Sequence, residues 1–155
     1  MKPNLPEEVY SVDQILAVSE ELHSYSVYLA AQRVQGVAGE PFILSSRAEA
    51  AVKRIPEDQR TDAGIEAYRL QLEGLATTAP AVTLVLAAQA KAGLKQELVN
   101  WLRTNVHPDL LVNFRANPNI AGGIVIRTIN HVYDCSFRQA LLAHPEKFTK
   151  ALDRV

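Results

Sequence analysis

The sequence predicts an α+β protein in which a helical bundle-like module, residues 1–78, precedes a smaller module, residues 80–155, with the element order β-α-β-β-β-α. Apolar residues recur at helical spacing throughout the first half, whereas short continuous or alternating apolar runs, which are typical of strands, occur only after Pro80. The charge changes at the same point. Residues 1–79 carry 7 Lys/Arg against 12 Asp/Glu, and residues 80–155 carry 9 against 5.

The first helix should begin at a capping box, because Ser11 is followed three residues later by Gln14. Apolar residues then continue at helical spacing up to residues 36–39, where two glycines interrupt the pattern. One long amphipathic helix is therefore expected at the start of the chain.

Two shorter helices should follow it. Ser46 and Glu49 repeat the capping-box spacing, and Pro56 stops the helix that they begin. A third helix is expected over residues 62–75. Small residues and a terminal proline at 74–80 then mark the boundary between the two modules.

The second half begins with a strand–helix–strand unit. The continuous apolar run at 82–87 predicts a buried strand, the helical spacing over 90–105 predicts a helix, and the alternation at 112–116 predicts a half-buried strand. A helix between two strands permits a right-handed crossover, so the simplest topology is a parallel first pair followed by antiparallel hairpins.

A turn into a third strand comes next. Pro118 and the two consecutive glycines, Gly122 and Gly123, precede a β-branched run at 124–129. At least one of these glycines should have a positive φ, since a sharp entry into a strand needs backbone geometry that other residues rarely adopt.

The last strand and helix complete the module. Val132 and Tyr133 form the apolar part of a returning strand, which makes a hairpin with the preceding one. Ser136 and Gln139 again have the capping-box spacing, so a helix should begin at Ser136.

The composition excludes several classes of protein. The 155 residues are enough to bury a core without disulfides, and the single cysteine cannot form an internal one. The longest apolar stretch, within residues 80–89, is far shorter than the roughly 20 residues of a membrane helix, and no signal peptide is evident. Basic residues are dispersed and lack interleaved aromatics, which argues against nucleic acid as a partner. We therefore expect a soluble, cytoplasmic protein.

Catalytic and metal-binding patterns are missing from the sequence. The four histidines share no ligand spacing, and there is neither an HExxH nor a CxxC motif. The Gly122–Gly123 pair lacks the Lys-Ser or Lys-Thr of a phosphate-binding loop. We therefore expect no catalytic residues, no cofactor and no metal.

One enzymatic alternative remains open. Cys135 lies near the start of the last expected helix, where backbone amides favour a thiolate, and His131 is close in sequence. The competing interpretation is that Cys135 is a small apolar residue in the core. Arg127 and Asp134 are placed to pair across the last hairpin, as a structural or a solvated ion pair.

The stretch from residue 117 to 142 resembles the C-terminal signature of the F-type ATP synthase delta subunit, the family that includes the oligomycin-sensitivity-conferring protein. The resemblance extends back to about Val82. The chain aligns with the pattern in register, without insertions, at Asn117, Pro118, Asn119, Ile120, Gly122, Gly123, Arg127, Asp134, Ser136 and Leu141. It departs from the pattern in residue type at Asn117, Ala121, Ile129 and Cys135, and its helical first half looks shorter than the six-helix domain of the family.

The resemblance implies a non-catalytic subunit of the peripheral stalk, or stator. In this family the helical module holds the N-terminal helices of the alpha subunits of the catalytic head, and the C-terminal module binds the C-terminal helices of the b subunits. Such a protein lies at the cytoplasmic face of the cell membrane and touches the membrane only through the complex. Two alternatives are a small cytosolic cysteine-dependent enzyme and a stand-alone helix-binding adaptor.

Candidate partner-binding residues lie on the apolar stripes of the first and last helices. A stripe that exceeds what its own module can cover is available to a partner helix. The candidates are Leu16, Tyr25 and Leu29 in the first helix, and Phe137, Leu141, Phe148 and Leu152 near the C-terminus.

Overall fold

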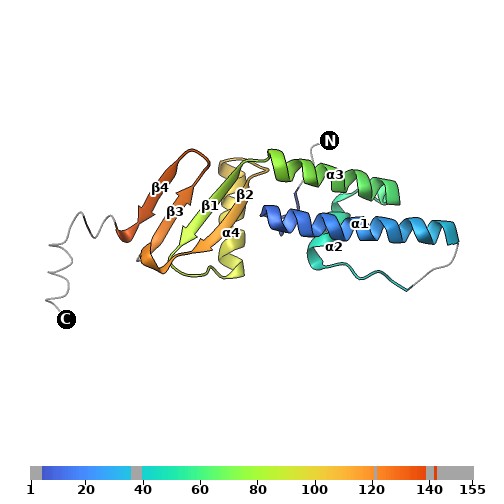
Figure 1. Cartoon of the computed structure of the whole chain (residues 1–155), viewed down its shortest axis with the longest axis horizontal. Coiled ribbons are helices and arrows are strands. Elements are labelled where there is room, and N and C mark those ends of the chain that lie inside the picture. Colours follow the sequence, from blue (N-terminus) through green and yellow to red (C-terminus); the bar gives the residue numbers. More distant parts are fainter. Residues whose placement is uncertain (1–4, 36–39, 121, 139–141, 143–155) are drawn as a thin grey trace. The chain divides into compact units, whose positions relative to one another are not determined.

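The computed structural model confirms the α+β class (Figure 1). It describes residues 5–35, 40–120, 122–138 and 142. The chain forms two compact units, of which the first contains residues 1–80 and 100–111 and the second contains residues 81–99 and 112–155.

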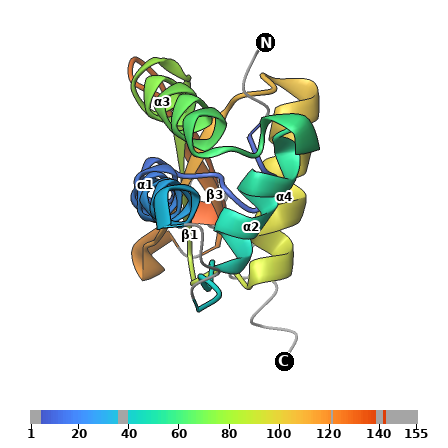
Figure 2. The same cartoon turned by 90° about the vertical axis from the view of Figure 1, so that its right-hand side faces the viewer.

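Three helices dominate the first unit. They are α1 (Val12–Gln35), α2 (Ser46–Arg54) and α3 (Asp62–Thr78). Helices α1 and α3 lie side by side in both views, and α2 follows the connection that leaves α1 (Figures 1 and 2). Fully buried aliphatic side chains from α1 and α3 form the core between them, namely Ile15 and Leu22 from α1 and Ile65 and Leu72 from α3.

The first capping box is present in a slightly altered form. The Gln14 amide donates to the Ser11 hydroxyl at 3.3 Å, as expected, but the Gln14 side-chain oxygen accepts from the amide of Tyr10 instead of Ser11. The prediction for α2 was wrong by one residue. Ser45 is the N-cap, because its backbone is extended while Ser46 is already helical, and its hydroxyl accepts from the Ala48 amide.

The boundary expected at residues 74–80 is mostly helical. Helix α3 continues to Thr78 instead of ending at Leu75, and the Ala79 amide still donates to the Leu75 carbonyl. The hydroxyls of Thr77 and Thr78 both donate to the carbonyl of Gly74, which satisfies a backbone group near the helix end. The glycine and threonines were therefore misleading as signs of a loop.

The first unit also includes a segment expected in the second module, residues 100–111. Arg103, near the end of α4 (Ala92–Asn105), binds three backbone carbonyls of this unit. Its guanidinium donates to Val9 at 2.8 Å, to Pro6 at 3.3 Å and to Leu110 at 3.3 Å. Burial lowers the pKa of Arg103, although Asp109 and Glu7 oppose this effect, and the charge is held by the carbonyl dipoles.

A four-stranded mixed sheet forms the second unit, with the strand order β2-β1-β3-β4. The strands are β1 (Ala81–Leu86), β2 (Leu111–Ala116), β3 (Gly123–Arg127) and β4 (Val132–Ser136). Strands β1 and β2 run in the same direction, as expected for a pair joined by a helix, and β4 forms the expected antiparallel hairpin with β3 (Figure 1).

The position of β3 differs from the simplest expectation. It pairs antiparallel with β1, with Val85 opposite Val125, instead of forming a hairpin with β2. The β2–β3 connection crosses the end of β1, where the Asn117 amide donates to the Leu86 carbonyl at 2.7 Å. Ile120 in this connection is buried against Val85 and Val125, and its burial stabilises the crossing.

The prediction for the two glycines is confirmed. Gly122 has a φ of 128° and Gly123 a φ of 80°. A Cβ atom on Gly123 would lie 2.5 Å from the Cys135 carbonyl oxygen, and one on Gly122 would lie 2.8 Å from the Phe137 ring. Both the backbone conformation and the close approach of β4 therefore require glycine.

Candidate partner-helix groove between α1 and α3

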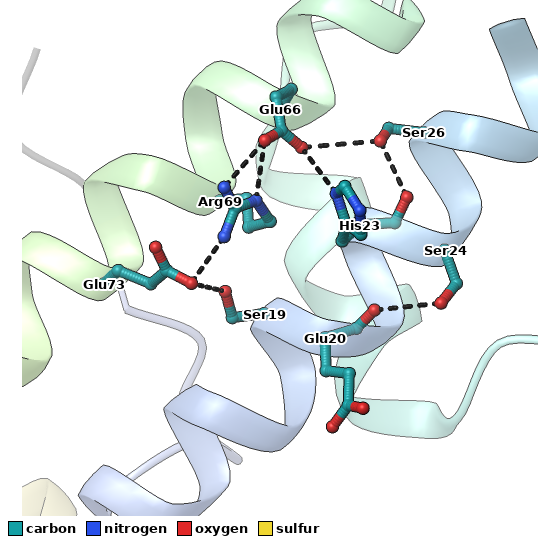
Figure 3. Close-up of polar contacts among 8 residues, drawn as sticks. All are labelled: Ser19, Glu20, His23, Ser24, Ser26, Glu66, Arg69 and Glu73. Carbon is teal, nitrogen blue, oxygen red and sulfur yellow. Dashed lines mark hydrogen bonds and ion pairs between the residues drawn. The ribbon is translucent and has the colours of Figure 1, made fainter.

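A chain of polar contacts links α1 to α3 on one side of their shared core (Figure 3). Arg69 donates two hydrogen bonds to Glu66 Oε1, at 2.9 and 2.7 Å, and one to Glu73 Oε1 at 2.5 Å. The Ser19 hydroxyl of α1 donates to the same Glu73 oxygen at 2.8 Å. The guanidinium thus orients both carboxylates on α3, and the Ser19 hydrogen bond joins one of them to α1.

The other oxygen of Glu66 faces α1. It lies 3.4 Å from His23 Nδ1 and 3.4 Å from Ser26 Oγ. The Arg69 hydrogen bonds, followed by that of His23, lower the pKa of the Glu66 carboxyl against the opposing effect of burial. The pKa of Arg69 is correspondingly raised by its hydrogen bond with Glu66. Glu66 therefore stays ionised at neutral pH.

A surface hollow of about 320 Å³ lies beside these contacts, between the two helices. Arg33 and Asp62 form an ion pair next to it, with two N···O distances of 3.1 Å. The hollow is lined by His23, Ser26, Val27 and Ala30 from α1 and by Asp62, Ala63 and Glu66 from α3. Small side chains at three of these positions allow another chain to approach the helices closely.

Large apolar side chains continue this surface along both helices. Leu16, Val27 and Val34 are 50, 56 and 82% exposed, and their spacings of 11 and 7 residues keep them within about 20° of one line on α1. Leu70, 55% exposed, lies one turn beyond Glu66 on α3. We call the hollow and these four side chains the α1–α3 groove. Exposed apolar side chains that recur along one line of a helix offer a partner helix a row of contacts.

The structure separates the three candidate residues of the first helix. Leu16 belongs to the α1–α3 groove. Tyr25 comes nine residues later, about 180° around the helix, and its ring lies 5.5 Å from that of Phe42. Leu29 is half-buried and is also turned away from the groove. The spacing among Leu16, Val27 and Val34 was the sequence signal that would have found the exposed stripe.

The candidates near the C-terminus are only partly described. Phe137 is 60% exposed and follows β4 directly. Leu141, Phe148 and Leu152 lie outside the described residues, and so does Gln139 of the expected capping box. Ser136 is the last residue of β4, and the next two residues, Phe137 and Arg138, are helical, so the expected helix begins one residue after Ser136.

The motif residues of the second unit have structural roles. Pro118 begins a 3-10 turn that ends at Ile120. Arg127 lies opposite Val132, whereas Asp134 lies opposite Val125, and the structure forms no ion pair between Arg127 and Asp134. Instead, an Asp134 oxygen accepts from the Ser136 amide at 2.9 Å. The prediction of a cross-strand pair was wrong because the aspartate makes a local turn-type contact with its own strand.

The geometry around Cys135 does not favour a Cys–His pair. Cys135 is an exposed residue of β4, opposite Ile124, and helical residues begin two positions later at Phe137. The His131 ring stacks on Tyr133 at 6.1 Å. Because alternate residues of a strand share a face, Tyr133 lies between His131 and Cys135, which are about 13 Å apart along an extended chain. That separation exceeds hydrogen-bond reach.

Other kinds of site find no support in the part of the chain that the structure describes. Within it, no three His, Cys, Asp or Glu side chains form a group that could hold a metal ion. None of its helices combines the length and the apolar character needed to cross a bilayer.

Comparison with known proteins returned no match, either among models of protein families or among curated proteins. The function proposed below therefore depends on the α1–α3 groove and on the signature in residues 117–142.

Proposed function

We propose that this protein is a non-catalytic adaptor that binds partner helices, and that it acts as a delta-like stator subunit of an F-type ATP synthase. In this role it links the catalytic head to the membrane-anchored b subunits at the cytoplasmic face of the membrane. The observation that carries the proposal is the α1–α3 groove, in which exposed apolar side chains and a hollow lie along two helices that are joined by polar contacts.

The groove suits an amphipathic helix as its occupant. A partner helix presents apolar residues three and four positions apart, which matches the line of Leu16, Val27 and Val34 along α1. Ala30 and Ala63 leave space for the partner's backbone to approach. An adaptor under mechanical load requires a large apolar contact and no reactive group, and the N-terminal helix of an alpha subunit is the partner that the resemblance suggests.

The second unit is the proposed site for the C-terminal helices of the b subunits. Its outer strand β4 exposes a large apolar side chain on each face, Val132 (63% exposed) on one and Tyr133 (55%) on the other, and Phe137, just after the strand, is 60% exposed. A helix of the b subunit that covers one of these faces would remove its apolar side chain from water.

Titration calorimetry of the intact chain with a peptide from the N-terminus of the alpha subunit of the same organism tests the proposal. We expect binding with a negative heat-capacity change, because apolar surface is buried. Replacing Val27 by Asp should abolish the signal, since it places a carboxylate in an apolar contact. Ile43→Asp is the matched control, because Ile43 is 89% exposed and lies outside the groove.

Circular dichroism of each variant must show retained helix content before the titrations are compared. Absence of heat from the unaltered chain at high micromolar peptide would contradict the proposed function. An equal loss of binding for Ile43→Asp and Val27→Asp would show that the peptide does not bind in the α1–α3 groove.

A further inference from the structure

Glu66 holds one carboxylate oxygen that lacks a strong hydrogen-bond donor. Oε1 accepts two hydrogen bonds from Arg69, at 2.9 and 2.7 Å, whereas Oε2 has only long and therefore weak contacts, with His23 Nδ1 and Ser26 Oγ each 3.4 Å away. The Ser26 hydroxyl has a single proton, and it donates that proton to the His23 carbonyl at 2.8 Å. Oε2 is therefore open to a cationic donor.

The hollow beside Glu66 has the composition that a long cationic side chain requires. Val27, Ala30 and Ala63 provide apolar walls for an aliphatic stem, and Glu66 provides an acceptor for the charged end. The second carboxylate of the hollow, on Asp62, is already held by both terminal nitrogens of Arg33. Glu66 Oε2 is thus the acceptor that remains.

The charge of the first unit favours the same kind of ligand. Residues 1–80 and 100–111 carry 8 Lys/Arg against 13 Asp/Glu, a net charge of −5. A cationic helix is attracted to such a surface, and the attraction falls as salt is added.

We propose that the hollow is a subsite for a Lys or Arg side chain projecting from the apolar face of the partner helix, with Glu66 Oε2 as its acceptor. This inference rests on the proposed function, because the same helix must occupy the groove. The cationic group sets the register of the helix along the groove, since a single acceptor fixes one position of the partner.

A double-mutant cycle with the peptide from the N-terminus of the alpha subunit tests the subsite. Each Lys or Arg of the peptide is replaced in turn by Met, which keeps the stem and removes the charge, and each peptide is titrated into the intact chain and into Glu66→Gln. We expect one Met substitution and Glu66→Gln each to weaken binding by about 5- to 10-fold, and their combination to weaken it no further. Asp58→Asn is the control for lost charge, because Asp58 is exposed and lies outside the groove.

The outcomes separate the subsite from the proposed function. The subsite is wrong if the native peptide binds Glu66→Gln as tightly as it binds the unaltered chain. It is also wrong if no Met substitution in the peptide weakens binding to the unaltered chain. Either result would leave the adaptor function intact. Absence of binding by the native peptide would overturn both. The Met substitutions leave the protein's fold untouched, so the test remains decisive if Glu66→Gln disturbs α3.

Discussion

Single residues decide how β3 and β4 approach each other, and Gly123 is the clearest example. We expect Gly123→Ala to lower the free energy of unfolding by about 1–3 kcal/mol, because it combines strain at a positive φ with a Cβ atom 2.5 Å from the Cys135 carbonyl oxygen. Urea denaturation followed by circular dichroism measures the change.

Gly93 provides the control for this substitution. It lies in α4, and a Cβ atom there would meet nothing within 4 Å. Gly93→Ala should raise the free energy of unfolding by up to about 1 kcal/mol, through helix propensity. Similar effects of the two alanine substitutions would contradict the explanation by strain.

Arg103 is a second single residue on which local structure depends, in this case the packing of the N-terminal segment. Arg103→Met removes the donor from three carbonyls, those of Pro6, Val9 and Leu110, while keeping much of the apolar stem. We expect a loss of about 2–3 kcal/mol in the free energy of unfolding, since partly buried acceptors are left without partners. Arg47→Met, at an exposed position of α2, should change stability by less than about 0.5 kcal/mol.

An effect limited to faster proteolysis within residues 5–11, with the urea midpoint unchanged, would show that Arg103 holds only the N-terminal segment. Native-state hydrogen exchange of the Val9 and Leu110 amides would then distinguish local release from global destabilisation.

At the scale of elements, the pairing of α1 with α3 should depend on pH through Glu66. The Arg69 hydrogen bonds lower its pKa from an ordinary value of 4.5, so ionised Glu66 stabilises the folded state above about pH 4.5. That contribution is lost as the pH falls through the lower pKa of the folded protein. Urea midpoints at pH 7 and pH 3 should show Glu66→Gln less stable than the unaltered chain at pH 7, with a smaller difference at pH 3.

All other carboxylates are common to the unaltered chain and Glu66→Gln. The difference between their urea midpoints therefore reports the contribution of Glu66 alone. A difference that stays constant or grows on acidification would contradict its role in joining α1 to α3. Glu49→Gln, in an exposed i,i+4 pair with Lys53, is a suitable second comparison.

For the whole molecule, the proposed function predicts two independent binding activities. Replacing Phe148 and Leu152 by Asp should abolish binding of a peptide from the C-terminus of the b subunit, because a carboxylate in an apolar interface is strongly unfavourable, while binding of the peptide from the alpha subunit is retained. Val27→Asp should abolish binding of the peptide from the alpha subunit and retain binding of the peptide from the b subunit. Calorimetry of the intact chain with each peptide makes the comparison, and loss of both activities in either variant would contradict their independence.

Local signals in the sequence were sufficient for the fold class and for most elements. Ser11 with Gln14 marked the start of α1, and the two consecutive glycines marked a tight entry into β3. Such features depend on neighbouring residues, through capping hydrogen bonds and allowed backbone angles. The largest local error was at the end of α3, where Thr77 and Thr78 extend the helix through a stretch with the composition of a loop.

Tertiary structure alone decided the order of strands and the location of the groove. Burial of Ile120 against Val85 and Val125 places β3 beside β1, and no local pattern specifies which strand it joins. The groove likewise depends on long-range packing. Leu16 and Tyr25 looked equivalent in the sequence, but the core between α1 and α3 leaves Leu16 exposed, whereas Phe42 covers Tyr25. Periodicity identifies an apolar face, whereas the neighbours brought by folding determine which of its residues remain open to a partner.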